Sequence, residues 1–371
     1  DAEEHGAAKA PEVAHAPVSH AVAAAAAQPV TLLDRDHSIL AFNERVLDWA
    51  VRDDVPLLER LRYLCIVSSN LDEFFEVRAE PHVNAVRHGE TEGLYTVASF
   101  EALAAKVHDL VARQYALYNQ VLVPAFAAHG IRILAHSERS AAHKRWVSAY
   151  FRREVRPLLV PVGLDPAHPF PLVANKSLNF IVRLKGQDAF GRANEIAIVR
   201  VPRALPRVIR MPEDVAGCEY GFVFLSSILH AHVGELFAGM TVAGCYQFRV
   251  TRNSDLFVDD EENKNLRETL AGELPQRHFG AAVRLEVADN CSESMAAFLL
   301  EQFELDRDAL YQVHGPVNLV RLMQVPDWVD RPDLKFSPFV PALPLRLAHK
   351  EDIFDQIRKG DILLHHPFES F

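Results

Sequence analysis

The sequence lacks several features that would place it in a common class of protein. Its four cysteines (Cys65, Cys218, Cys245 and Cys291) are scattered without a CxxC pair, which argues against a zinc ribbon or a disulfide framework and favours a reducing compartment. No apolar run approaches the length that spans a bilayer. The formal net charge of −11 excludes a generally basic, nucleic-acid-binding chain, so a polyanion would need a locally basic site.

The common nucleotide-binding and catalytic signatures are missing too. Neither a GxGxxG loop nor a phosphate-binding GxxxxGK loop is present, and we find no HExxH, GxSxG or protein-kinase signature. His230 and His232 have a ligand-like spacing for a strand, but on the helix expected there their side chains diverge. The acidic run at 259–262 stands where a helix should start, and His365-His366 precedes a proline turn. That histidine pair could be catalytic, and the end of a strand beside a proline turn explains it at least as well. The residues alone therefore show no complete catalytic constellation.

What is present divides the 371 residues into four regions. Residues 1–30 are rich in alanine and of low complexity, which predicts a disordered tail. Residues 31–130 have helical spacing throughout and predict a helical bundle. Residues 131–345 alternate strands and helices without a regular βαβ order, which predicts an α+β domain. Residues 346–371 contain a helix-like stretch at 351–359 and a strand-like one at 361–364, which reads as the start of a further, truncated domain.

The helical region contains four predicted helices. The second begins at Pro56, the third near Asn70, and the fourth spans 97–128 and closes at Gly130. Residues on the core-facing side of the first helix are spaced by three or four: Ile39, Phe42, Val46, Leu47 and Ala50.

The α+β region begins with a short strand at 131–134 and a helix at 138–156. Further strands are expected at 177–184, 195–201, 220–225, 242–251 and 281–287, with helices at 226–237, 261–278 and 292–303.

The most informative segment is the run from Ser68 to Phe75. Ser69 with Asp72, or Asn70 with Glu73, has the spacing of a capping box at a helix start. One interpretation is a helix cap and nothing more. The other is that this terminus, with free N–H groups and the positive end of the helix dipole, faces a phosphorylated ligand.

Two polar segments leave alternatives open. The proline-rich loop 165–171 is rigid, and with His168 and Asn175 it either binds a ligand or braces a domain junction. The segment 251–255 ends a strand and has Arg249 on the same face. It either contacts phosphate or pairs with the acids that follow.

Taken together, several segments of the sequence resemble one family, the bacterial polyphosphate kinases of the first type. The resemblance rests on Phe42 to Leu47 with Ser69 to Phe74, on 165–171 with 175–179, and on Phe248 to Asn253. It continues through Pro332 to Lys335 and Asp361 to Phe368. The similarity spans about residues 31–371 in the family's order.

The resemblance implies a multidomain fold: an N-terminal helical domain, a middle (head) domain of α+β type, and the first strand of a phospholipase-D-like catalytic domain. It implies a cytoplasmic enzyme, with a peripheral position at the membrane left open. The reaction would be reversible transfer of the terminal phosphoryl group of ATP to inorganic polyphosphate, through a phosphohistidine and with Mg²⁺.

The family's histidine nucleophile and its metal ligands lie in C-terminal domains beyond this chain, so no catalytic or metal-binding residue is carried over. Asn70 matches the family asparagine that contacts ATP, and the first two domains take part in forming a homodimer or higher homo-oligomer. The alternative is a free-standing, non-catalytic module for dimerisation or nucleotide sensing.

Overall fold

The fold is that of a computed structural model, which describes residues 32–165, 169–187, 195–254, 280–344, 347 and 352–369. Its contacts divide the chain into two units, Asp1–Arg35 and Asp36–Phe371, and everything discussed below belongs to the second. The tail expected at 1–30, the loop residue His168, the acidic run 259–262 and the helix expected at 261–278 lie outside the described residues.

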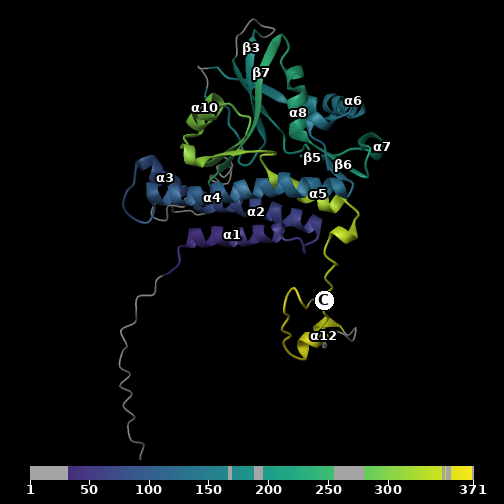
Figure 1. The fold of residues 1–371 in the computed structure, drawn as a ribbon. Coiled ribbons are helices and arrows are strands. Elements are labelled where there is room, and N and C mark those ends of the chain that lie inside the picture. Colours follow the sequence, from purple (N-terminus) through teal and green to yellow (C-terminus); the bar gives the residue numbers. More distant parts are fainter. Residues whose placement is uncertain are drawn as a thin grey trace, which may run out of the picture. The chain divides into compact units, whose positions relative to one another are not determined.

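The predicted helical region is confirmed. It comprises α1 (Arg35–Val51), α2 (Leu57–Arg78), α3 (Glu80–His88) and α4 (Val97–Leu117), followed by a π-helical turn (Tyr118–Leu122) and α5 (Val123–Ala128). Thr96 caps α4, because its side chain accepts a hydrogen bond from the backbone N–H of Ser99 at 3.1 Å. Figure 1 shows α1, α2 and α4 running alongside one another on one side of the strands.

The predicted core face of α1 is only partly right. Leu47 and Ala50 are buried as expected, but Phe42 is 54% exposed. The face that packs inward consists of Asp36, Leu40, Asn43, Leu47 and Ala50. Asp36 and Asn43 lie on the buried face although they are polar, because their side chains have hydrogen-bonding partners there. A prediction from hydrophobicity alone therefore placed the buried face of α1 at the wrong angle.

Two sheets follow the helices, which confirms the α+β class. The larger has the order β2 (Val160–Gly163), β4 (Ile196–Arg200), β3 (Asn179–Gly186), β7 (Met240–Arg252), β8 (Ala282–Ala288) and β9 (Leu310–Val313). Its neighbours are antiparallel except for the parallel pair β8 and β9. The smaller has the order β1 (Ile131–Ile133), β6 (Tyr220–Phe224) and β5 (Val208–Arg210).

Short helices connect the strands. The main ones are α6 (Ala141–Tyr150), α7 (Glu213–Ala216), α8 (Leu225–His232), α10 (Glu293–Phe303) and α11 (Val325–Trp328), with a 3-10 helix at Leu319–Gln324. β2, β5 and β9 were not predicted. β1 is equally short, but its Ile131 and Ile133 flank a polar residue, whereas the other three segments show no clear alternation of apolar and polar residues.

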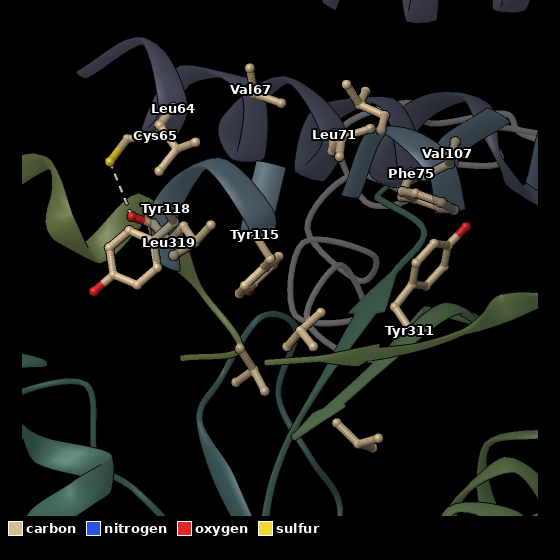
Figure 2. Close-up of a cluster of buried hydrophobic side chains, with 14 of the residues drawn as sticks. Leu64, Cys65, Val67, Leu71, Phe75, Val107, Tyr115, Tyr118, Tyr311 and Leu319 are labelled. Carbon is tan, nitrogen blue, oxygen red and sulfur yellow. Dashed lines mark hydrogen bonds between the residues drawn. The ribbon is translucent and has the colours of Figure 1, made fainter. Parts of the chain in front are cut away.

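One hydrophobic core joins the helices to the larger sheet. It includes Leu64, Leu71 and Phe75 of α2 together with Val250, Leu285 and Tyr311 of the strands. Figure 2 shows Phe75 close to Tyr311, and Cys65 donating a hydrogen bond to the carbonyl of Leu319 at 3.1 Å. A second core on the other face holds Phe180, Val182, Val199 and the inner sides of α6 and α8. The helical and α+β regions are therefore packed as one folded unit.

The C-terminal stretch contains the expected helix, α12 (Ile353–Arg358), capped by Asp352, whose carboxylate accepts from the backbone N–H of Phe354 at 2.8 Å. Residues 361–365 are irregular, so the strand expected at 361–364 is not formed in this chain. A strand requires a neighbour to hydrogen-bond with, and its place in a further domain stays a prediction. Among the described helices, none is long and apolar enough to cross a membrane.

Candidate functional site

The segment that resembled a capping box lies inside a helix. α2 is continuous from Leu57 to Arg78, so Asn70 is in its interior, and the next helix begins only at Glu80. The prediction of a helix N-terminus near Asn70 is therefore wrong. Asn70 thus does not lie at the positive end of a helix dipole, so the dipole gives no reason to expect a phosphate contact there.

Of the capping candidates, Asn70 and Asp72 have tertiary partners instead, as has Ser68, whereas Ser69 and Glu73 are exposed. Gln114 of α4 donates to the hydroxyl of Ser68 at 2.7 Å. Asn70 bonds to Asn43 of α1, and Asp72 is paired with Arg249 of β7. Such partners satisfy polar groups that would be costly to bury alone. These three residues link α2 to α4, α1 and β7.

Asn70 is held in one orientation by Asn43. The buried Asn43 donates from Nδ2 to the carbonyl of Val67 at 3.0 Å, which turns its Oδ1 toward Asn70. Asn70 therefore presents Nδ2 to Asn43, again at 3.0 Å. Its own Oδ1 points away from this bond and has no hydrogen-bond partner among the described residues. Asn70 is half-buried, so the chain offers a fixed acceptor oxygen at the surface of the helical layer.

A buried cluster of four charges fastens α2 to the sheet. Arg249 donates to both carboxylate oxygens of Asp72, at 2.8 and 2.9 Å, and also contacts Glu286. Arg284 contacts Asp72, lies 3.2 Å from Glu286, and sits over the ring of Phe75 at 4.5 Å. The two cations and two anions balance. Arg249 is therefore engaged by acids on α2 and β8, and the acidic run that follows its strand lies outside the described residues.

Burial and pairing act in opposite directions on these groups. Burial favours the neutral form of Asp72, but Arg249 and Arg284 outweigh it and lower the pKa of that carboxyl below its usual value. For Glu286 burial dominates, and its pKa is raised in spite of the same two arginines. Burial would lower the pKa of Arg249, yet Asp72 and Glu286 raise it. Asp72 is thus the anion on which the cluster depends most.

Asn175 braces the same junction. Its Nδ2 donates to the carboxylate of Glu76 on α2 at 2.5 Å, and its Oδ1 accepts from the backbone N–H of Arg252 at 2.9 Å. Lys176 adds an ion pair to Glu76 at 2.7 Å. Of the two roles left open for this loop, bracing is the one the contacts support at Asn175.

The histidines considered as ligands are not brought together. His232 lies at the end of α8, contacts Glu235 at 3.0 Å and stacks on Phe151, as expected for a helix. His365 donates its backbone N–H to Glu369. Within the described ranges no group of three His, Cys, Asp or Glu side chains is placed to hold a metal ion. The described donors do not fit Mg²⁺, and its expected location in other domains stays a prediction.

The sequence did not reveal three residues that pair with those above: Asn43 with Asn70, Glu76 with Asn175, and Glu286 with Arg249. The only available signal was a polar side chain on an otherwise apolar helix face or strand, as at Asn43. Such a signal shows that a partner is needed but not which one it is.

Comparison with known proteins gives two family-model matches. The polyphosphate kinase N-terminal domain matches residues 32–134, and the polyphosphate kinase middle domain matches residues 142–325. Both matches fall on the helices and sheets described above, in the same order.

The curated relatives agree. A polyphosphate kinase of Burkholderia vietnamiensis is 51% identical over 344 residues, covering 92% of this chain and 50% of that protein. One from Neisseria meningitidis is 52% identical over 344 residues, with the same coverage. The crystal structure of polyphosphate kinase from Porphyromonas gingivalis superposes with a TM-score of 0.73 at 26% identity, covering 92% of this chain and 48% of that one. The chain spans about half the length of the relatives it matches.

Proposed function

Because this chain belongs to the polyphosphate kinase family, in which it matches the N-terminal and middle domains, we propose that it is the nucleotide-contacting and scaffolding part of a polyphosphate kinase. The full-length enzyme would reversibly transfer the terminal phosphoryl group of ATP to inorganic polyphosphate. ATP, ADP and polyphosphate are then its substrates, and Mg²⁺ its cofactor.

The observation that carries the nucleotide contact is the orientation of Asn70. Its Nδ2 is used by Asn43, and its Oδ1 is a hydrogen-bond acceptor without a partner among the described residues. An acceptor suits the amino group of adenine or a ribose hydroxyl, both of which can donate, and it does not suit a phosphate oxygen. Asn70 therefore contacts the nucleoside end of ATP, which differs from the phosphate contact that a helix terminus would have made.

Phosphoryl transfer depends mainly on alignment and on cations around the transferred group. The residues that would supply them, including the phosphorylated histidine, belong to phospholipase-D-like domains beyond this chain. His82, His143 and His232 make structural contacts, and no described histidine is proposed as the nucleophile. The role of this chain is to fix one end of the nucleotide and to support the homo-oligomer.

An assay of ATP-dependent polyphosphate synthesis tests whether the catalytic groups lie outside this chain. We expect synthesis by the full-length enzyme and none by residues 1–371 alone. The structural reason is that no group of three His, Cys, Asp or Glu side chains among the described residues is placed to hold a metal ion. Robust synthesis by this chain alone would contradict the proposal. Reading the gene past Phe371 separates it from the alternative of a non-catalytic module, because a continuing frame supports an enzyme and a stop codon supports the module.

A further inference from the structure

A second cluster of cations lies apart from the charge-balanced one. A small cavity is lined by Lys176, Arg207, Arg249 and Arg321, together with the polar side chains of Ser226, Gln247 and Asn318. We call this cavity the arginine pocket. No carboxylate is among the described residues that line it. Its surroundings are thus positive in a chain whose formal net charge is −11.

Two of these cations are neutralised and two are not. Arg249 is paired with Asp72 and Glu286, and Lys176 is paired with Glu76. Arg207 and Arg321 have no ion pair with any described residue. The uncompensated charge of the arginine pocket therefore resides on these two guanidinium groups.

Arg207 is the less satisfied of the two. Its Nη2 donates to the carbonyl of Val201 at 3.3 Å, but its Nη1 is buried and has no hydrogen-bond partner. A buried charged donor without an acceptor is unfavourable, and folded proteins rarely leave one unpaired unless a ligand or water completes it. The guanidinium fork suits the oxygens of a phosphoryl group.

The neighbouring charges strengthen this requirement. Burial, and then the like charges of Arg321 and Arg203, lower the pKa of Arg207 to about 10. The pKa of Arg321 is lowered by burial and then by Arg249 and Arg203, with Asp72 opposing in part. Like charges held this close repel one another, and an anion between them would remove that repulsion.

We propose that the arginine pocket binds a phosphoryl oxyanion through Arg207 and Arg321. Its volume of about 30 Å³ corresponds to roughly two water molecules, so it holds one phosphoryl group and not a nucleoside. A larger cavity of about 420 Å³ shares Phe224, Ser226, Gln247 and Pro316 with it and offers space for the rest of a longer ligand. Asn70 lines neither cavity, so this site is independent of the nucleotide contact proposed above.

Isothermal titration calorimetry on the 371-residue chain tests the site with three probes: inorganic phosphate, tripolyphosphate and ATP. The ionic strength is kept constant, because screening alone changes the affinity of any anion. We expect Arg207→Gln and Arg321→Gln each to weaken binding at least about tenfold, the order expected for loss of a charge-assisted contact.

Arg145→Gln is the matched control, since Arg145 is an exposed arginine of α6 and its loss changes the net charge equally. It should leave the affinity for each probe within about twofold. Inorganic phosphate and tripolyphosphate contain no nucleoside, so their binding tests this site independently of the contact proposed at Asn70. Although Arg321 lines the pocket, the residue is partly exposed to solvent, and its variant is expected to keep the wild-type melting temperature even if Arg207→Gln disturbs folding.

The three probes identify the source of the phosphoryl group. Saturation by inorganic phosphate indicates a single oxyanion, a preference for tripolyphosphate indicates a chain, and a preference for ATP indicates a nucleotide whose organic part occupies the larger cavity. Each of these supports the site if the arginine variants abolish it. The proposal is overturned if none of the probes binds, or if Arg145→Gln weakens binding as much as Arg321→Gln does.

Discussion

Arg249 on β7 donates two parallel hydrogen bonds to the carboxylate of Asp72 on α2, at 2.8 and 2.9 Å, and both side chains are buried. This bidentate pair joins the helical layer to the central strand of the larger sheet. A pair of this kind is sensitive to loss of either member, because the remaining charge stays buried without a counter-ion.

Asp72→Asn should therefore destabilise the chain by about 3–5 kcal/mol, the range for breaking a buried ion pair. Urea unfolding monitored by circular dichroism measures the loss. Glu73→Gln is the control: it removes a carboxylate from the neighbouring, exposed position of the same helix, and its effect should stay within about 0.5 kcal/mol. Equal effects of the two substitutions would mean that the Arg249 pair adds nothing to stability.

The same pair predicts a pH dependence. The pKa of Asp72 is lowered in the folded state, so its contribution is present above the unfolded value of about 3.9 and is lost as the pH falls through the folded value. Asp72→Asn should accordingly be less stable at pH 7 but lose less stability between about pH 5 and pH 2. Urea midpoints across this range provide the comparison, and parallel curves for the two proteins would contradict the assignment.

The contribution of Glu286 to stability should depend on pH in the opposite sense to that of Asp72. Burial raises the pKa of Glu286, so its favourable contribution is present at low pH and is lost as the pH rises through the folded value. Glu286→Gln should then cost less stability at pH 7 than Asp72→Asn, although both acids contact the same arginines. A larger loss for Glu286→Gln in the same urea titration would reverse the roles given to the two acids.

The brace at Asn175 is expected to be structural. Asn175→Ala removes the hydrogen bonds to Glu76 and to the backbone of Arg252, which should cost about 1–3 kcal/mol. Thermal unfolding of this variant can be compared with that of Asn290→Ala, a change at an exposed turn after β8. If Asn175→Ala is as stable as Asn290→Ala, the loop does not brace the junction.

Cysteine reactivity reports on the core. Burial raises the pKa of the Cys245 thiol to about 12, against an ordinary value of about 8.5. Since the thiolate is the reactive form, Cys245 should resist a disulfide reagent at pH 8 in the folded chain and react on unfolding. Cys218, which is less buried, should react before it. Mass spectrometry after timed labelling gives the order, and early labelling of Cys245 would show that this part of the core opens readily.

Much of the fold was predictable because the apolar spacing is local. The helices at 97–128 and 292–303 and the strands at 220–225 and 242–251 follow directly from such patterns, and the structure contains them. Tertiary pairing was not predictable in the same way. Asn70 and Asp72 look like helix caps in the sequence, but they are interior residues of the continuous helix α2. Their partners Asn43 and Arg249 lie far away in the sequence and could not be read from it.

The candidate site shows the same limit. Asn70 was identified through a family resemblance, but the orientation of its side chain depends on Asn43 and on the carbonyl of Val67. The arginine pocket brings together residues from β-strand, loop and 3-10 segments that are distant in the sequence. No spacing rule connects them, so such a site is visible only once the chain is folded.

The most direct measurement is the ATP dependence of polyphosphate synthesis by the full-length enzyme carrying Asn70→Ala, with Ser69→Ala as the control at the exposed neighbouring position. Loss of one hydrogen bond to the nucleoside should lower kcat/KM for ATP about tenfold, mainly through KM, with little change in melting temperature. Unchanged ATP kinetics in Asn70→Ala would contradict the nucleotide contact and leave Asn70 as a structural link between α1 and α2.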